Sequence, residues 1–122
     1  MSDVNHVVVT GRLTADATAR DVGTSTVFDF SIAVNHYDKK ESKEVADFFN
    51  VKVWAASPKQ AEFYKSALVK GSAIVTDGRL SQESWQGQDG QKKSRVVILS
   101  NSVTPMGSHR GGESSDSGFP TE

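Results

Sequence analysis

Asp47-Phe48-Phe49-Asn50-Val51-Lys52-Val53-Trp54 is the stretch from which the fold can be inferred. Aromatic and β-branched residues dominate it, and neither glycine nor proline interrupts it, so it predicts a β-strand. Because side chains alternate between the two faces of a strand, Phe49, Val51 and Val53 share one face. We expect that apolar face to lie in the core.

The other face of this strand carries Phe48, Asn50, Lys52 and Trp54. Two large rings that bracket an amide and a cation match neither an ordinary exposed face nor an ordinary buried one. They suit a ligand with flat rings and negative charges, and single-stranded nucleic acid is such a ligand. The alternative is structural: Phe48 and Trp54 pack under a helix or against another subunit, and Lys52 extends between them to solvent.

The composition limits the classes of protein to consider. The chain has 122 residues, the length of one domain, and no cysteine, which excludes disulfides, a thiolate nucleophile and a zinc ribbon. Its histidines, His6, His36 and His109, lack metal-ligand spacing, so neither a metal nor another cofactor is expected. No apolar run approaches the roughly 20 residues that span a bilayer. The N-terminus lacks the pattern of a signal peptide, so we expect a soluble, cytoplasmic protein.

The net charge argues weakly against a nucleic-acid ligand. The formal net charge is −1. Residues 1–107 carry 13 Lys and Arg against 12 Asp and Glu, a net of +1, and residues 108–122 carry one against three, a net of −2. A basic balance is the usual mark of a nucleic-acid binder. Binding would therefore depend on the local placement of cations.

Four further strands and one helix are predicted around the opening stretch. Alternation and turn residues predict the strands at Val4–Thr10, Thr26–Asn35, Ser72 through Leu80 and on to Trp85, and Ser94–Val103. Gly11 and Gly78, which lack a side chain, predict bends or bulges, and Asp89-Gly90 predicts the hairpin turn between the last two strands. The helix of about 13 residues starts at Ser57-Pro58 and ends at Lys70-Gly71.

Three segments lie outside the predicted strands and helix. Arg12–Arg20 is polar and is expected to be irregular. His36–Ala46 is highly charged, and it is either a solvated loop or a hairpin arm that closes over a ligand with Tyr37 and its lysines. From Ser108 onward the chain is rich in Ser, Gly, Asp and Glu, so residues 108–122 are expected to form a short disordered acidic tail after a domain of residues 1–107.

This order of elements predicts an all-β, five-stranded Greek-key OB-fold barrel, because its single helix lies between strands three and four. Such barrels bind ligands across strands two and three, where Phe48, Asn50, Lys52 and Trp54 would lie. Trp85, beside a glycine-rich turn, is either a subunit contact or a further stacking platform.

Several segments match one family in order and spacing. They are Val4–Leu13, Phe30–Asn35, Asp47–Trp54, Lys70-Gly71-Ser72, and Gly78-Arg79-Leu80 through Ser84-Trp85. Over residues 3–107 the chain resembles the bacterial-type single-stranded-DNA-binding protein. The resemblance implies a homotetramer that binds and protects single-stranded DNA, without sequence preference, during DNA replication, recombination and repair. This places the protein in the cytoplasm at the nucleoid.

The resemblance also assigns roles to residues. It implies stacking by Phe48, Trp54 and Trp85, with Tyr37 as an approximate further match, and phosphate contacts by Arg12, Lys70 and Arg79. Asn50 and Lys52 are added to the predicted DNA-binding residues only because alternation places them on the same face of the strand as Phe48 and Trp54. The tail departs from the family, which typically ends in aspartates and a terminal Pro-Phe that recruit replication and repair proteins. Here Phe119 and Pro120 are reversed and precede Thr121-Glu122, so recruitment through the tail is in doubt.

Two other functions stay open. An OB-fold interaction module of primosomal type would use the aromatics in a subunit interface, and substitution of Phe48 or Trp54 would then dissociate the oligomer instead of abolishing DNA binding. A nuclease needs clustered carboxylates or histidines, but the acids are spread along the chain, so we expect a protein that is not an enzyme. The sequence does not determine whether the protein is a dimer or a tetramer, or how many nucleotides it covers.

Overall fold

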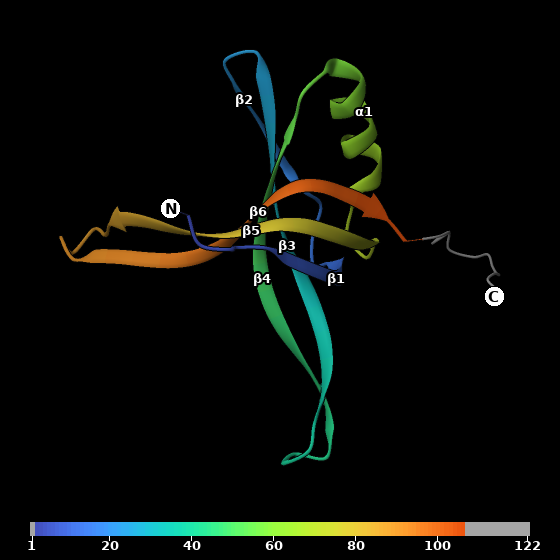
Figure 1. The fold of residues 1–122 in the computed structure, drawn as a ribbon, viewed down its shortest axis with the longest axis vertical. Coiled ribbons are helices and arrows are strands. Elements are labelled where there is room, and N and C mark those ends of the chain that lie inside the picture. The colour runs from blue at the N-terminus through green and yellow to red at the C-terminus, as the bar shows by residue number, and fades with distance from the viewer. Residues whose placement is uncertain (1, 107–122) are drawn as a thin grey trace.

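A computed structural model describes residues 2–106 of the chain (Figure 1). In that range it contains six strands and one helix: β1 Val7–Leu13, β2 Thr18–Val22, β3 Ser25–Asp38, β4 Lys43–Ala55, α1 Pro58–Ala67, β5 Ala73–Gln86 and β6 Lys92–Pro105. The predicted acidic tail of residues 108–122 lies outside the described residues, so the domain boundary at 107 stays a prediction.

Five of these strands form a closed barrel. β1 pairs with β5, β5 with β6, β6 with β4, β4 with β3, and β3 returns to β1. All of these pairs are antiparallel except β4–β6, which is parallel. The helix lies between β4 and β5, the third and fourth strands of the barrel. The predicted five-stranded OB-fold barrel is confirmed, and β2 is an additional strand that pairs with β3.

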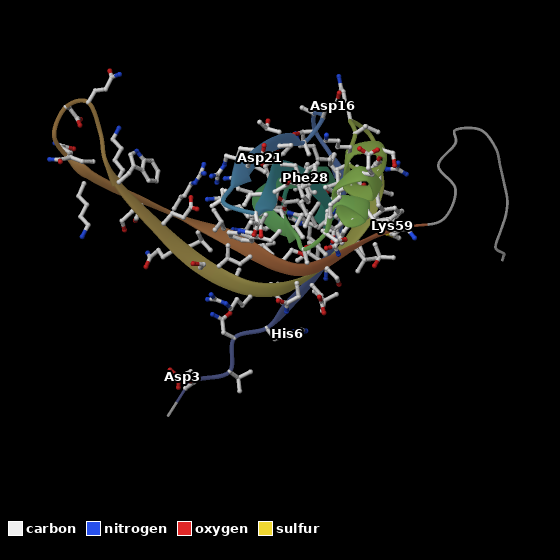
Figure 2. All side chains as sticks on the ribbon, turned by 90° about the horizontal axis from the view of Figure 1, so that it is seen from above. Asp3, His6, Asp16, Asp21, Phe28 and Lys59 are labelled. Carbon is white, nitrogen blue, oxygen red and sulfur yellow. The ribbon has the colours of Figure 1, made fainter. Side chains whose placement is uncertain are left out.

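The core follows from alternation along β3 and β4. Phe28, Phe30 and Ile32 of β3 are buried with Val51 and Val53 of β4, as predicted. Figure 2 shows Phe28 inside the ring of strands. A core therefore forms where apolar residues of period two meet across the barrel.

Phe49 was wrongly predicted to be a core residue, since it is exposed. It has the same phase as Val51, but β6 covers β4 only from Asn50 to Val53. Phe49 lies just past that segment, where no strand closes over its side chain. Alternation along the strand correctly predicts the face on which Phe49 lies, but it does not show where the barrel ends.

The helix begins where the sequence predicts and ends earlier. The Ser57 hydroxyl accepts a hydrogen bond of 3.2 Å from the Gln60 N–H, and Pro58 occupies the first turn. The helix has 10 residues, not 13, because the chain leaves helical geometry at Leu68. Lys70 and Gly71 therefore lie in the loop before β5, where Gly71 has a φ of 87°.

Two segments outside the predicted strands contain paired strands. β3 and β4 continue as a paired ribbon to Asp38 and from Lys43, so His36–Ala46 is a hairpin arm, one of its two predicted forms, rather than a loop. β2 occupies part of Arg12–Arg20 and continues to Val22. Both segments form backbone pairs but bury few side chains. They therefore need no alternating apolar residues, and their sequences lack the pattern that predicts a strand. In Figure 1 the β3–β4 and β5–β6 ribbons leave the barrel in different directions.

The first strand is also displaced from its prediction. β1 begins at Val7, and the preceding Asn5 side chain instead brackets Leu80, donating to its carbonyl and accepting from its N–H. Gly78 marks a bulge, as predicted: the register of β5 against β6 shifts between Asp77 and Gly78. A Cβ at Gly78 would lie 2.0 Å from the Leu99 carbonyl oxygen, so the two backbones are in direct contact there.

Candidate nucleic-acid interface

The outward face of β4 carries the four side chains that strand phase selected. Phe48 is 67% exposed and Trp54 is 44% exposed, whereas Asn50 and Lys52 are half-buried between them. The strand rise places the two rings roughly 20 Å apart. The partners of these four residues on β3 are small or polar except one: Ala33, Ser31, Asp29 and Val27.

Asn50 lies in a shallow groove beside this face. Its side-chain oxygen accepts a hydrogen bond of 2.9 Å from the Ser31 hydroxyl, which leaves the amide NH₂ available to a ligand. The groove has a volume of about 330 Å³. It is lined by residues of β2, β3, β4 and β6 and of the segment before β2: Thr14, Ala15, Asp16, Thr18, Asp29, Phe30, Ser31, Asn50, Val51, Lys52, Arg95 and Val97.

Three strands contribute to a charged cluster at the edge of this groove. The Lys52 ammonium of β4 forms an ion pair with the Glu83 carboxylate of β5, and Arg95 Nε of β6 donates to the same carboxylate at 3.2 Å. The hydrogen bond from Lys52 is the largest cause of the lowered pKa of Glu83, and Arg95 adds to it. Lys52 is therefore on the predicted face, but it is already paired.

Trp85 lies on the same side of the sheet as Lys52. It is 45% exposed on β5, and alternation gives it the same face as Glu83. The guanidinium carbon of Arg95 lies 5.7 Å from its ring centroid, a cation–π distance. Glu83 and Arg95 were missed by the sequence interpretation, although the shared phase of Glu83 and Trp85 could have indicated the first of them.

Two of the predicted phosphate-binding cations reach this face through the strand register. Arg12 and Phe48 both lie opposite Ala33, one from β1 and the other from β4, and Arg12 donates to the Gly71 carbonyl at 3.1 Å. Arg79 lies opposite Leu99, which is in turn opposite Lys52. Both arginines are exposed, so the structure brings them together with the aromatic residues.

The remaining two predicted residues lie further away. Lys70 is in the loop after α1, where its main-chain N–H donates to Asp16 at the edge of the groove. Tyr37 is exposed on the β3–β4 ribbon opposite Glu44, beyond the barrel. Alternation gives it the same side of β3 as Ala33, so it extends the face along the ribbon.

The described residues also bear on other kinds of site. Among residues 2–106, no group of three or more His, Cys, Asp or Glu side chains is placed to hold a metal ion. In the same range, no helix has the length and apolar character needed to cross a membrane.

Comparison with known proteins gives consistent matches. The sequence model of the "Single-strand binding protein family" matches residues 4–106. The chain is 36% identical over 115 residues to the single-stranded DNA-binding protein of Treponema pallidum, covering 92% of this chain and 63% of that protein. It is 35% identical over 111 residues to the Bacillus cereus protein of the same name, covering 89% of this chain and 64% of that one. The chain thus spans less than two thirds of the length of these relatives.

A solved structure supports the fold. The Plasmodium falciparum SSB complex with ssDNA superposes with a TM-score of 0.74, covering 87% of this chain and 97% of that chain. The two sequences are 19% identical, so this likeness concerns the architecture of the barrel.

Proposed function

The chain belongs to the single-strand binding protein family, and from this premise we propose that it binds and protects single-stranded DNA without sequence preference. In this proposal the protein binds DNA without catalysis, as its sequence led us to expect. The observation that supports the proposal best is that Phe48, Trp54 and Trp85 present exposed rings on one face beside arginines and a lysine.

Stacking on these rings supplies the sequence-independent part of the affinity. Every base has a flat face, and each stacked base contributes roughly 1–3 kcal/mol. The separation of Phe48 and Trp54 along β4 allows them to stack on different bases. The Asn50 amide lies between the rings and can donate to a base or a phosphate.

Phosphate contacts supply the salt-dependent part. Arg12 is exposed in the cross-strand row of Phe48, Arg79 is exposed in the row of Lys52, and Arg95 lies beside Trp85. Affinity should fall with salt at a log–log slope of about −0.7 for each phosphate neutralised. An affinity for poly(dT) that stays constant between low and high salt would contradict these contacts.

The deciding experiment is a fluorescence titration of the intact protein with poly(dT), with duplex DNA of equal length as the control. Trp54→Phe and Trp85→Phe leave one tryptophan each, so each ring is observed separately while a stackable ring remains. We expect both tryptophans to be quenched by the single strand and neither by the duplex. Absence of quenching and of binding would refute the proposed function.

The same proposal includes self-association. Beyond the aromatic face, Val8, Leu80 and Val96 are exposed on β1, β5 and β6, where a second copy could cover them. We infer an oligomer, with a tetramer as the form that the family suggests, acting in DNA replication, recombination and repair in the cytoplasm. Sedimentation of Trp54→Ala tests the alternative of an interaction module: an oligomer that dissociates would place Trp54 in a subunit interface.

A further inference from the structure

Glu83 is an acidic residue at the centre of a face that would meet phosphates. Its two carboxylate oxygens are both in use, Oε2 with the Lys52 ammonium and Oε1 with Arg95 Nε. Lys52 and Glu83 are well covered, with 19% and 27% of their side chains exposed. The pairing is thus shielded from solvent more than an ordinary surface pair.

Lys52 and Arg95 hold the Glu83 carboxylate in the way that they would hold a phosphate group. A carboxylate and a phosphate both accept charge-assisted hydrogen bonds through separate oxygens, and cations bind them interchangeably. Here the acceptor comes from β5 and the donors from β4 and β6, so the three strands already form an anion site. Glu83 occupies that site from within the chain.

Arg95 is restrained from two sides. Glu83 holds its Nε, and its guanidinium lies over the Trp85 ring at 5.7 Å. In this position Arg95 covers one face of a ring that a base would stack on. Release of Arg95 from Glu83 would therefore free both a cation for a phosphate and a ring face for a base.

We infer that Glu83 is an internal competitor of the DNA phosphate, which holds Lys52 and Arg95 neutralised until a single strand displaces it. The inference rests on the proposed function, and it deepens it by naming a residue that lowers affinity. The nucleic acid exchanges one anion for another at this site, so Lys52 and Arg95 contribute less net affinity than free cations would.

Glu83→Gln removes the competing charge and keeps the shape of the side chain. Arg95 is the more exposed of the two donors, with 48% of its side chain exposed, and ion pairs at the surface contribute little, so we expect the affinity for poly(dT) to rise about two- to fivefold at low salt. Each further phosphate neutralised adds about −0.7 to the salt slope, so the advantage of the variant should shrink about 2.6-fold between 50 and 200 mM salt.

Glu62→Gln is the matched control. It makes the same change of charge on the exposed surface of α1, away from the aromatic face, and should leave the affinity within error of the original protein. A gain equal to that of Glu83→Gln would mean that net charge alone is responsible, which would overturn the inference.

A double variant tests whether Glu83 lowers the affinity by pairing with Lys52. In a Lys52→Met background, Glu83→Gln should raise affinity less than it does in the original protein, because one of the two competed cations is gone. Thermal unfolding verifies that each variant is folded. If Glu83→Gln is folded and binds equally or more weakly, Glu83 is not a competitor.

The outcomes separate the two proposals. Failure of the original protein to bind poly(dT) refutes the proposed function. Binding by the original protein without any gain in Glu83→Gln refutes only the role of Glu83.

Discussion

Replacing Phe48 by alanine removes one stacking ring and leaves both tryptophans in place as reporters. Phe48 is 67% exposed, so its ring buries little surface in the free protein and its loss should hardly change the free energy of unfolding. Trp54 is a less clean test, because more of its ring is covered and truncation would also expose its neighbour Val27 on β3.

The expected loss of binding follows from one stacked base. Stacking contributes roughly 1–3 kcal/mol per base, which corresponds to a loss of about 5- to 150-fold in affinity for poly(dT). Arg12 lies in the same cross-strand row and is unchanged in this variant, so the phosphate contact proposed for it should persist. The salt slope of Phe48→Ala should therefore equal that of the original protein.

Phe63→Ala is the matched control for this experiment. Phe63 is 47% exposed on α1 beside Tyr64, and α1 carries none of the predicted DNA-contact residues. The titration follows tryptophan quenching, and urea unfolding checks stability. Equal losses of affinity in the two variants, or a loss below twofold in Phe48→Ala, would refute stacking at Phe48.

Three other predictions concern the stability of the barrel. Gly78→Ala places a Cβ 2.0 Å from the Leu99 carbonyl, so urea unfolding should show a loss of roughly 3 kcal/mol; a loss below 1 kcal/mol would mean that the bulge relaxes. Ser57→Ala removes the hydroxyl that accepts from Gln60 N–H and should cost about 1 kcal/mol in the same assay, with an unchanged midpoint as the contrary result. The folded state lowers the pKa of Glu83 below its usual 4.5, so its stabilising effect is present above that pH and is lost on acidification through the folded value. The difference in unfolding free energy between the original protein and Glu83→Gln should therefore shrink from pH 7 to pH 3, and a constant difference would contradict the ion pairs.

The sequence predicts the barrel because the buried apolar residues of its strands alternate with other residues along the chain. Phe28 and Ile32 on β3, like Val51 and Val53 on β4, repeat every second residue and meet across a shared interior. The extended ribbons and β2 lack that pattern: every residue of β2 is exposed, and β2 is held to β3 by backbone pairing and by polar contacts of Arg20 with Asp29 and of Asp21 with Thr26. Local composition therefore does not distinguish such strands from loops.

The candidate site likewise has a part that could be predicted from the sequence and a part that could not. Phe48 and Trp54 could be identified from phase within one strand, because both lie on the outward face of β4. The cluster of Lys52, Glu83 and Arg95 could not, because it requires β6 to lie between β4 and β5. That order arises from a parallel pairing between segments distant in the chain, which no local pattern encodes.

The lengths of the strand pairings bear on the order in which the molecule folds. The hairpins β3–β4 and β5–β6 pair along nearly their whole length and join neighbouring segments, so each can form early, on a timescale of about 1–10 μs. β4 and β6 pair only between Asn50–Val53 and Val97–Ser100, and the loop that this pairing closes includes α1 and β5. Such a distant, short contact is expected to form late. Since Asn50, Lys52 and Val97 line the groove at this junction, the proposed DNA-binding surface forms only when the barrel closes. A nascent or partly folded chain would have its aromatic residues but no continuous face on which to arrange a strand of DNA.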